Sequence, residues 1–349
     1  MSDQAAAGVE MTAAGGRRRV HPVRRLLIER VPFGVLTLFA VSVIVFAATQ
    51  VLPGNAAYAV LGHSATPASL HALEQQLGLN KSPVSQYWHW LSSLLQGHPG
   101  LSLVAGGSGL GGGGAAQESV ASIVGPRLGN SAFLVAVSGV LGTVIGVGLG
   151  LWAAIRRDKL VDHVLSVALL AVAALPEFVV GIALVLVFAS VVLHVLPGVS
   201  VLSPGEPPWR DLKLLVLPVA TLVLVTAPYT FRMARAATIE ALESDYVEMA
   251  RLKGLSTRRV LLRHALPNAL APTIQVIGLN FLYLAGGIVV VEFVFDYPGI
   301  GQGLVNAVSD RDIPTIQFIV LLLATFYVCM NIVTDVISLI ASPRRRLAR

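Results

Sequence analysis

The stretch YVEMARLKGLSTRRVLLRHALPNALAP, from Tyr246 to Pro272, concentrates charge in a chain that is otherwise mostly apolar. Of the 349 residues, 55% are hydrophobic and 13% are charged, whereas a soluble domain carries about 25% charged residues. This composition excludes an ordinary soluble protein and indicates an integral membrane protein. A charged stretch of this kind must then lie outside the bilayer, between membrane-spanning apolar segments.

The chain contains six apolar segments, and each is long enough to cross about 30 Å of hydrocarbon as a helix. We therefore predict an all-α integral membrane fold with six transmembrane helices. The third segment contains LPEF, Leu175 to Phe178, and is predicted as one tilted or broken helix, with a re-entrant hairpin of two half-helices as the alternative. The segments are Phe33–Leu52, Asn130–Ala154, Val164–Leu193, Leu214–Phe231, Leu270–Val294 and Pro314–Ile340.

The distribution of lysine and arginine predicts the orientation of these helices. If the N-terminus is cytoplasmic, the segments on the cytoplasmic side hold 20 of the 25 lysines and arginines. Positive residues favour the cytoplasmic side of a membrane. Both termini and the charged stretch are therefore predicted to be cytoplasmic, in a multi-pass protein.

The predicted domain organisation follows from these segments. Residues 1–30 form a cytoplasmic tail that is expected to be disordered, residues 31–342 form the membrane domain, and residues 343–349 form a basic cytoplasmic tail. A large extracytoplasmic loop, residues 53–127, contains the glycine-rich insert 106–114. This insert lacks the lysine and hydroxyl residue of a phosphate-binding loop, so we interpret it as a flexible linker and expect no nucleotide site in the chain.

The charged stretch itself has the pattern of two short helices. Residues from Thr238 form helix-favouring sequence that stops at Gly254, Ser256 can cap a second helix, and Pro267 ends or redirects that helix into the fifth span. The spacing of Tyr246, Met249, Ala250 and Lys253 gives a small, mostly apolar face surrounded by charge. Such a face suits a groove in a partner protein, although a solvated basic loop that fixes topology is the alternative.

The same stretch resembles the EAA signature of ATP-binding-cassette importer permeases. That signature is Glu-Ala-Ala, three residues, Gly, nine residues, then Ile, any residue, Leu-Pro; here Glu248, Ala250, Gly254, Leu266 and Pro267 match it. Met249 replaces an alanine and His264 an isoleucine. Three further stretches resemble the dipeptide, oligopeptide and nickel permease subfamily. They are LEQQLGLNKSPVSQYWHWLSSLLQGHPGLSL, residues 73–103, VEFVFDYPGIGQGLVNAVSDRDIPTIQ, residues 291–317, and NIVTDVISLIASPR, residues 331–344.

The resemblance implies a type I importer fold like that of methionine-importer permeases, and a non-catalytic subunit of an ATP-hydrolysing complex in a bacterial plasma membrane. Residues 238–267 would be the coupling segment, which sits in a cleft of a cytoplasmic ATPase subunit. Two such subunits, which bind ATP and Mg²⁺, would dock on the complex. A second, homologous permease chain would complete a heterodimer, and an extracytoplasmic solute-binding protein would deliver the solute; no nucleic acid is implied. Di- and oligopeptides are the expected cargo. Nickel chelates, heme or another small solute remain alternatives, and a secondary transporter is a remote one.

Three acidic residues fall within predicted spans, where an uncompensated charge is costly. Glu177 is a candidate for the substrate path, since its carboxylate could meet the amino group of a peptide; pairing with a neighbouring helix is the alternative. Glu292 and Asp335 are expected to be structural, through hydrogen bonds inside the membrane domain. The sequence Asp310-Arg311-Asp312 is interpreted either as a docking point for a binding protein or as a solvated loop.

Overall fold

The computed structural model is a bundle of long helices, and it describes residues 22–51, 80–103, 118–202, 206–260 and 265–341, together with residues 66–68, 71, 75 and 263. Five of its helices are long and apolar enough to cross a membrane, and a sixth span results if one bent pair counts as a single crossing. The prediction of an all-helical membrane fold is thereby confirmed. The five are α1 (Pro22–Val51), α5 (Val120–Ile155), α8 (Leu212–Leu242), α11 (Leu266–Val294) and α13 (Ile313–Ala341).

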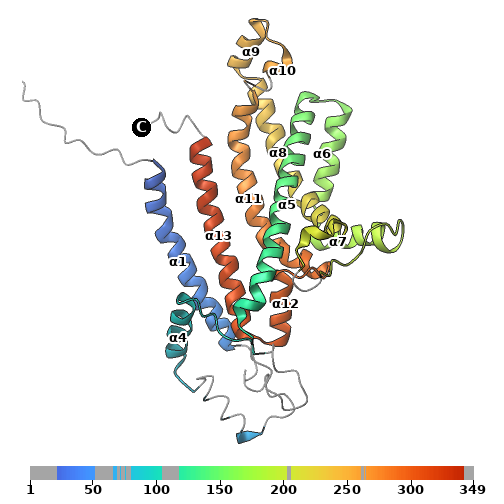
Figure 1. Cartoon of the computed structure of the whole chain (residues 1–349). Coiled ribbons are helices and arrows are strands. Elements are labelled where there is room, and N and C mark those ends of the chain that lie inside the picture. The colour runs from blue at the N-terminus through green and yellow to red at the C-terminus, as the bar shows by residue number, and fades with distance from the viewer. Residues whose placement is uncertain are drawn as a thin grey trace, which may run out of the picture.

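The shorter elements lie at the two ends of the bundle or beside it (Figure 1). Helices α9 and α10 lie at the same end as the start of α1 and the end of α13, whereas α4 and α12 lie toward the opposite end. Their bounds are α4 Pro83–Leu95, α6 Leu160–Ala173, α7 Glu177–Val185, α9 Asp245–Leu252, α10 Thr257–Val260 and α12 Ile300–Asp310, with a π-turn at Leu186–Ser190 and a 3₁₀ turn at Pro208–Arg210.

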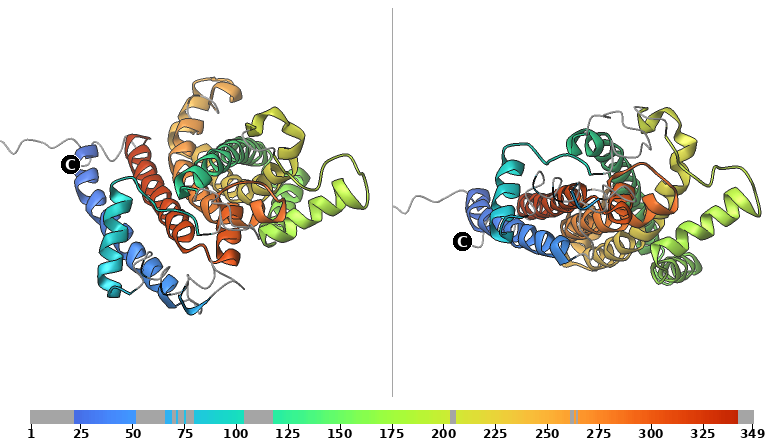
Figure 2. Two further views of the ribbon diagram at one scale, coloured as in Figure 1. Left: turned by 60° about the horizontal axis from the view of Figure 1, so that its bottom comes forward. Right: turned by 90° about the horizontal axis from the view of Figure 1, so that it is seen from below.

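The long helices pack around a centre formed by α5, α8 and α11, which all contact one another. Helix α1 packs on α13, α13 on α11, α11 on α8, and α8 on both α5 and α6. The views in Figure 2 agree with this order, with α1 and α4 on one side of the bundle and α6 on the other. The buried core is centred where α5, α8 and α11 meet, and Leu134, Leu222 and Leu284 are almost fully buried there.

The third predicted span is two helices, α6 and α7, which meet at a bend of 103° around residues 174–176. Pro176 directly precedes α7, and it weakens the helix at the bend because proline lacks the amide hydrogen that an internal helical hydrogen bond requires. Either of the two predicted arrangements, a broken span or a re-entrant pair, has this geometry.

The structure moves two predicted boundaries. Helix α1 begins at Pro22, so residues 22–30 are helical and not part of a disordered tail; an i,i+4 ion pair between Arg25 and Glu29 supports this extra length. Helix α5 begins at Val120, inside the predicted loop 53–127, because Ser119 caps it by accepting a hydrogen bond from the amide of Ala121. Residues 1–21, the insert 106–114 and the tail 343–349 lie outside the described residues.

Helices α5 and α8 approach each other closely because glycines of α5 face α8. A Cβ added at Gly146 would lie 2.7 Å from Cβ of Thr230 and 2.8 Å from the carbonyl oxygen of Ala227. Small residues at such contacts are how helices pack in membranes, where burial from water contributes little. Gly148, on the same helix, has open space around the corresponding position.

This contrast gives a matched test of the α5–α8 contact. Replacing Gly146 with leucine is expected to destabilise the membrane domain by about 2–3 kcal/mol, because the added side chain forces the two backbones apart. Gly148→Leu, in the same helix and with the same change of residue, is expected to leave stability nearly unchanged. Thermal unfolding of the purified variants measures both, and equal midpoints for the two would contradict the contact.

Candidate functional site

The charged stretch forms a helical hairpin, α9 and α10, that projects from one end of the bundle between the end of α8 and the start of α11 (Figure 1). Helix α8 stops at Leu242 and α9 begins at Asp245, after a break at Glu243 and Ser244. The sequence was expected to run as one helix from Thr238 to Gly254, so this break is a correction. Its cause is local: Ser244 is extended, and Asp245 and Glu248 then lie in the first turn of a new helix, where carboxylates are favoured.

Gly254 ends α9 as predicted. Its φ is +73°, a left-handed conformation that favours glycine. Its amide donates to the carbonyl oxygen of Arg251 (2.9 Å), and the amide of Leu255 donates to that of Ala250 (3.3 Å). This pair of bonds is the Schellman arrangement, which satisfies carbonyls left free at a helix end. The turn therefore fixes the direction in which α10 leaves α9.

One face of the hairpin is packed against its own chain through small residues. Val247 and Val260 are almost fully buried, and Ala250 is 6% exposed. They share an apolar cluster with alanines at the end of α8 and the start of α11. The alanines are Ala237, Ala241, Ala265 and Ala269. The hairpin is thus seated directly on the ends of two long helices, so a force on it is transmitted to both.

The opposite face of α9 is exposed and carries large apolar side chains. Tyr246 is 36% exposed, Met249 55% and Leu252 76%. Glu248 and Lys253 are exposed beside them. The predicted outer face is corrected in one respect: Ala250 points inward, because the helix buries its small residues against α8 and α11. Sequence reasoning missed Leu252, although it lies one turn after Glu248 and next to Met249 around the helix.

Leu266 and Pro267 begin α11, the fifth predicted span, and do not end the second short helix, α10, which stops at Val260. Proline is well suited to the first turn of a helix, where its missing amide hydrogen costs nothing. Leu266 is partly buried and Pro267 is exposed. His264 lies outside the described residues.

A buried ion pair connects α8 to α6 near the hairpin. Arg235 donates to Asp162 through Nε at 2.6 Å and through Nη2 at 2.7 Å, and the Asp162 side chain is only 3% exposed. A second ion pair joins Arg157, after α5, to Glu243, after α8. The bidentate pair between Arg235 and Asp162 fixes the relative geometry of α8 and α6 and also neutralises both charges. Helices α5, α6 and α8 therefore form a stiff base for α9.

Glu177 is the first residue of α7, and its carboxylate reaches α11. The hydroxyl of Tyr283 donates to Oε2 of Glu177 at 2.8 Å. Glu177 is half-buried, and the Tyr283 ring is close to that of Tyr229 on α8, with centroids 6.5 Å apart. The structure therefore places Glu177 beside a tyrosine pair at the surface of the isolated chain.

Glu292 and Asp335 are held by other helices. Glu292 is fully buried; Ser131 of α5 donates to its Oε1 at 2.5 Å and the Gly301 amide of α12 to its Oε2 at 2.7 Å. Asp335 on α13 pairs with Arg30 on α1 at 2.9 Å. Each carboxylate thus links two segments that are far apart in the sequence.

Asp312 also binds within the chain. Its carboxylate accepts hydrogen bonds from Ser102 at 2.5 Å and from Thr315 at 2.7 Å, and it is 5% exposed. Both earlier interpretations of Asp310-Arg311-Asp312 treated this residue as exposed, so they are wrong for Asp312. Asp310 and Arg311 are exposed.

Taken together, these features define a polytopic α-helical membrane protein with a helical hairpin rigidly mounted at one end, the class to which transporter permeases belong. Residues 146–347 match the family described as binding-protein-dependent transport system inner membrane component, and residues 23–132 match the corresponding N-terminal family. The chain belongs to this family and is an inner membrane permease subunit of an ABC importer.

Curated relatives cover almost the whole chain. The glutathione transport system permease protein GsiC of Escherichia coli strain K12 is 34% identical over 320 residues, which is 92% of this chain and 98% of that protein. GsiC of Shigella flexneri serotype 5b has the same identity and coverage. Among solved structures, an inward-facing form of the MetNI methionine ABC transporter is similar in fold, with a TM-score of 0.50, 16% identity, and coverage of 63% of this chain and 97% of that one.

Proposed function

We propose that this chain is one of two permease subunits of an importer for small peptides, and that α9 is the element through which ATPase subunits move it. The observation that carries the docking proposal is the outward apolar face of α9. Tyr246, Met249 and Leu252 are exposed there while the other face is packed on α8 and α11. Exposed apolar side chains rimmed by charge are typical of a helix that fits a groove in a partner.

The coupling mechanism follows from how α9 is mounted. ATP binding and hydrolysis take place in the ATPase subunits, and this chain contributes no catalytic residue. When those subunits close or separate, they displace α9. Because the Gly254 turn and the Asp162–Arg235 pair keep α9, α8 and α6 from moving independently, the displacement becomes a rigid-body motion of the spans. That motion alternates access to a path shared with a second permease chain.

The orientation and the cargo are part of the proposal. The start of α1, the end of α13 and the hairpin share one end of the bundle (Figure 1), which agrees with both termini and the ATPase contact being cytoplasmic. A binding protein would then deliver solute at the opposite end. Small peptides are favoured as cargo because the relatives of 34% identity are named as glutathione permeases, and glutathione is a tripeptide.

The docking proposal is tested by the double substitution Met249→Asp, Leu252→Asp. Two carboxylates on the apolar face are expected to reduce co-purification of the ATPase subunits at least about tenfold, because they would be buried without partners. Leu95→Asp is the control, since Leu95 is 80% exposed on α4, away from the hairpin. Full retention of the ATPases by the double variant would refute the assignment of α9.

The cargo proposal needs the complete transporter in proteoliposomes, with its binding protein outside and ATP inside. Uptake of labelled glutathione and of tri-alanine is measured with and without ATP. ATP-dependent uptake of at least one of these is expected. If neither peptide enters while the same complex imports a nickel chelate or heme, the peptide proposal fails and the importer class stands.

A further inference from the structure

A pocket of about 480 Å³ opens between α8 and α11. Its walls combine aliphatic side chains with polar ones: Tyr229, Arg232, Val276, Leu279, Asn280 and Tyr283. Pockets of roughly 300–1,000 Å³ with a few placed polar groups are typical of small-ligand sites. The pocket is therefore large enough for a solute of a few residues, and its polar groups can decide which one.

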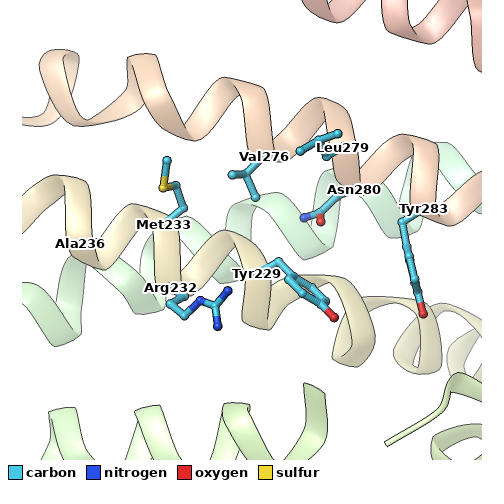
Figure 3. Close-up of a pocket in the computed structure, with 8 residues that line it drawn as sticks. All are labelled: Tyr229, Arg232, Met233, Ala236, Val276, Leu279, Asn280 and Tyr283. Atoms are coloured by element: carbon cyan, nitrogen blue, oxygen red, sulfur yellow. The ribbon is translucent and has the colours of Figure 1, made fainter. Parts of the chain in front are cut away.

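The polar groups are arranged in a row. Figure 3 shows Arg232 and Tyr229 on α8, and Tyr283 on α11, extending toward the same side of the two helices. Arg232 and Tyr229 are three residues apart and so are neighbours on one helix face. The rings of Tyr229 and Tyr283 are 6.5 Å apart, and the Tyr283 hydroxyl donates to Glu177. The polar row, Arg232–Tyr229–Tyr283–Glu177, thus has a cation at one end and a carboxylate at the other.

The row is held in place by buried bonds behind it. Asn280, between the two helices in Figure 3, donates from Nδ2 to the hydroxyl of Thr230 at 2.7 Å and to the carbonyl oxygen of Thr226 at 3.2 Å. These bonds fix the register of α11 on α8. The spacing between Tyr283 and Tyr229 is therefore set by the fold and not by flexible side chains alone.

The two charged ends of the row are not neutralised by each other or by neighbours. Within the described part of the chain, Arg232 has no ion pair or hydrogen bond, and Glu177 has Tyr283 as its one hydrogen-bond partner. Asp162 and Arg235, by contrast, neutralise each other, although Arg235 is only about one helical turn from Arg232 on α8. Charges on spanning helices face protein or water rather than lipid. Arg232 and Glu177 therefore face either the water-filled path or a bound solute that carries the complementary charges.

We propose that the polar row binds a peptide lengthwise, with Arg232 at its terminal carboxylate, Glu177 at its terminal ammonium and the tyrosines along its backbone. This rests on the proposed function. The row is long enough for such a peptide: three residues of helix rise about 5 Å from Arg232 to Tyr229, the two tyrosine rings lie 6.5 Å apart, and the Tyr283 hydroxyl lies a further 2.8 Å from Glu177. An extended tripeptide spans about 10 Å.

The test uses the assembled importer in nanodiscs without its binding protein, so that the permease alone selects. Binding of tri-alanine, its C-terminal amide and its N-acetyl derivative is measured by saturation-transfer NMR. The wild-type complex is expected to bind tri-alanine about tenfold more tightly than either derivative, since each derivative loses one charge-assisted hydrogen bond.

Substitutions at Arg232 and Glu177 show which end of the peptide each residue binds. Arg232→Gln is expected to weaken the binding of tri-alanine about tenfold without weakening the binding of its C-terminal amide. Arg232→Lys is expected to restore part of this loss. Glu177→Gln is expected to weaken the binding of tri-alanine about tenfold without weakening the binding of the N-acetyl peptide. Arg210→Gln is the control, because Arg210 is exposed outside the row and pairs with Glu206.

Two results overturn the proposal: a wild-type complex that does not distinguish the three peptides, or variants that weaken all three equally, as a purely structural role would. Uptake with the binding protein separates this failure from that of the proposed function. If wild-type proteoliposomes import peptides but the row shows no end preference, only the row is refuted. If no peptide is imported, the cargo proposal itself fails.

Discussion

Gly254→Pro is expected to reduce ATP-driven transport at least about tenfold while the membrane domain stays folded. Proline fixes φ near −65° and has no amide hydrogen, whereas Gly254 has a φ of +73° and donates to the carbonyl oxygen of Arg251. The turn must therefore re-form, and α10 leaves α9 in another direction. The exposed face of α9 then no longer meets its partner in the geometry that transmits force.

Gly254→Ala is the matched comparison. No atom lies within 4 Å of a Cβ added there, so alanine meets only the conformational cost of a left-handed residue, roughly 1–2 kcal/mol. Transport by the alanine variant should stay within about threefold of wild type. Peptide uptake, ATPase co-purification and thermal unfolding are measured for both. Equal transport by the two variants, or global unfolding of the proline variant, would contradict a role confined to coupling.

The sequence was sufficient to predict this hairpin because its signals are local. A glycine stop and the fixed spacing from Glu248 to Pro267 depend only on neighbouring residues. The family assignment and the helical membrane fold were also predictable, because long apolar segments in lipid have few alternatives to helix. The tetrapeptide LPEF marked the bend between α6 and α7, because Pro176 has no amide hydrogen for a helical hydrogen bond. Proline alone was not a sufficient signal, since Pro218 and Pro228 lie inside α8 without ending it.

What could not be predicted depends on contacts between distant segments. Periodicity put Ala250 on one face with Tyr246 and Met249, but only the positions of α8 and α11 decide that Ala250 is covered. Asp312 looked like an exposed acidic residue until Ser102, over two hundred positions earlier, was found to bind it. The polar row is a similar case: Tyr229 and Tyr283 have no sequence signal that relates them to Glu177, and the relation exists only because α7, α8 and α11 meet.

Glu292 gives the second large effect, and it concerns stability rather than coupling. Its carboxylate accepts hydrogen bonds from Ser131 and from the amides of Gly301 and Gln302, at the N-terminus of α12. Glycines leave it the necessary room, since a Cβ added at Gly301 would lie 2.9 Å from Oε2 of Glu292. One buried carboxylate therefore joins α11, α5 and α12.

Glu292→Ala is expected to destabilise the purified complex by about 3 kcal/mol, because it leaves several buried donors without acceptors. Glu292→Gln is expected to lose about 1 kcal/mol or less. The glutamine can turn its oxygen toward the amides of Gly301 and Gln302 and donate from its nitrogen to the Ser131 hydroxyl. Glu206→Ala, which removes an exposed carboxylate paired with Arg210, should change stability by under about 0.5 kcal/mol.

Thermal unfolding of the three variants, together with protease cleavage around α12, measures their relative stability. Because the amide keeps the shape and most hydrogen bonds of the carboxylate but not its charge, the glutamine variant separates the two contributions. A glutamine variant as unstable as the alanine variant would mean that the negative charge at the helix terminus dominates. An alanine variant as stable as Glu206→Ala would contradict the structural role of Glu292, because buried donors without acceptors cannot be neutral.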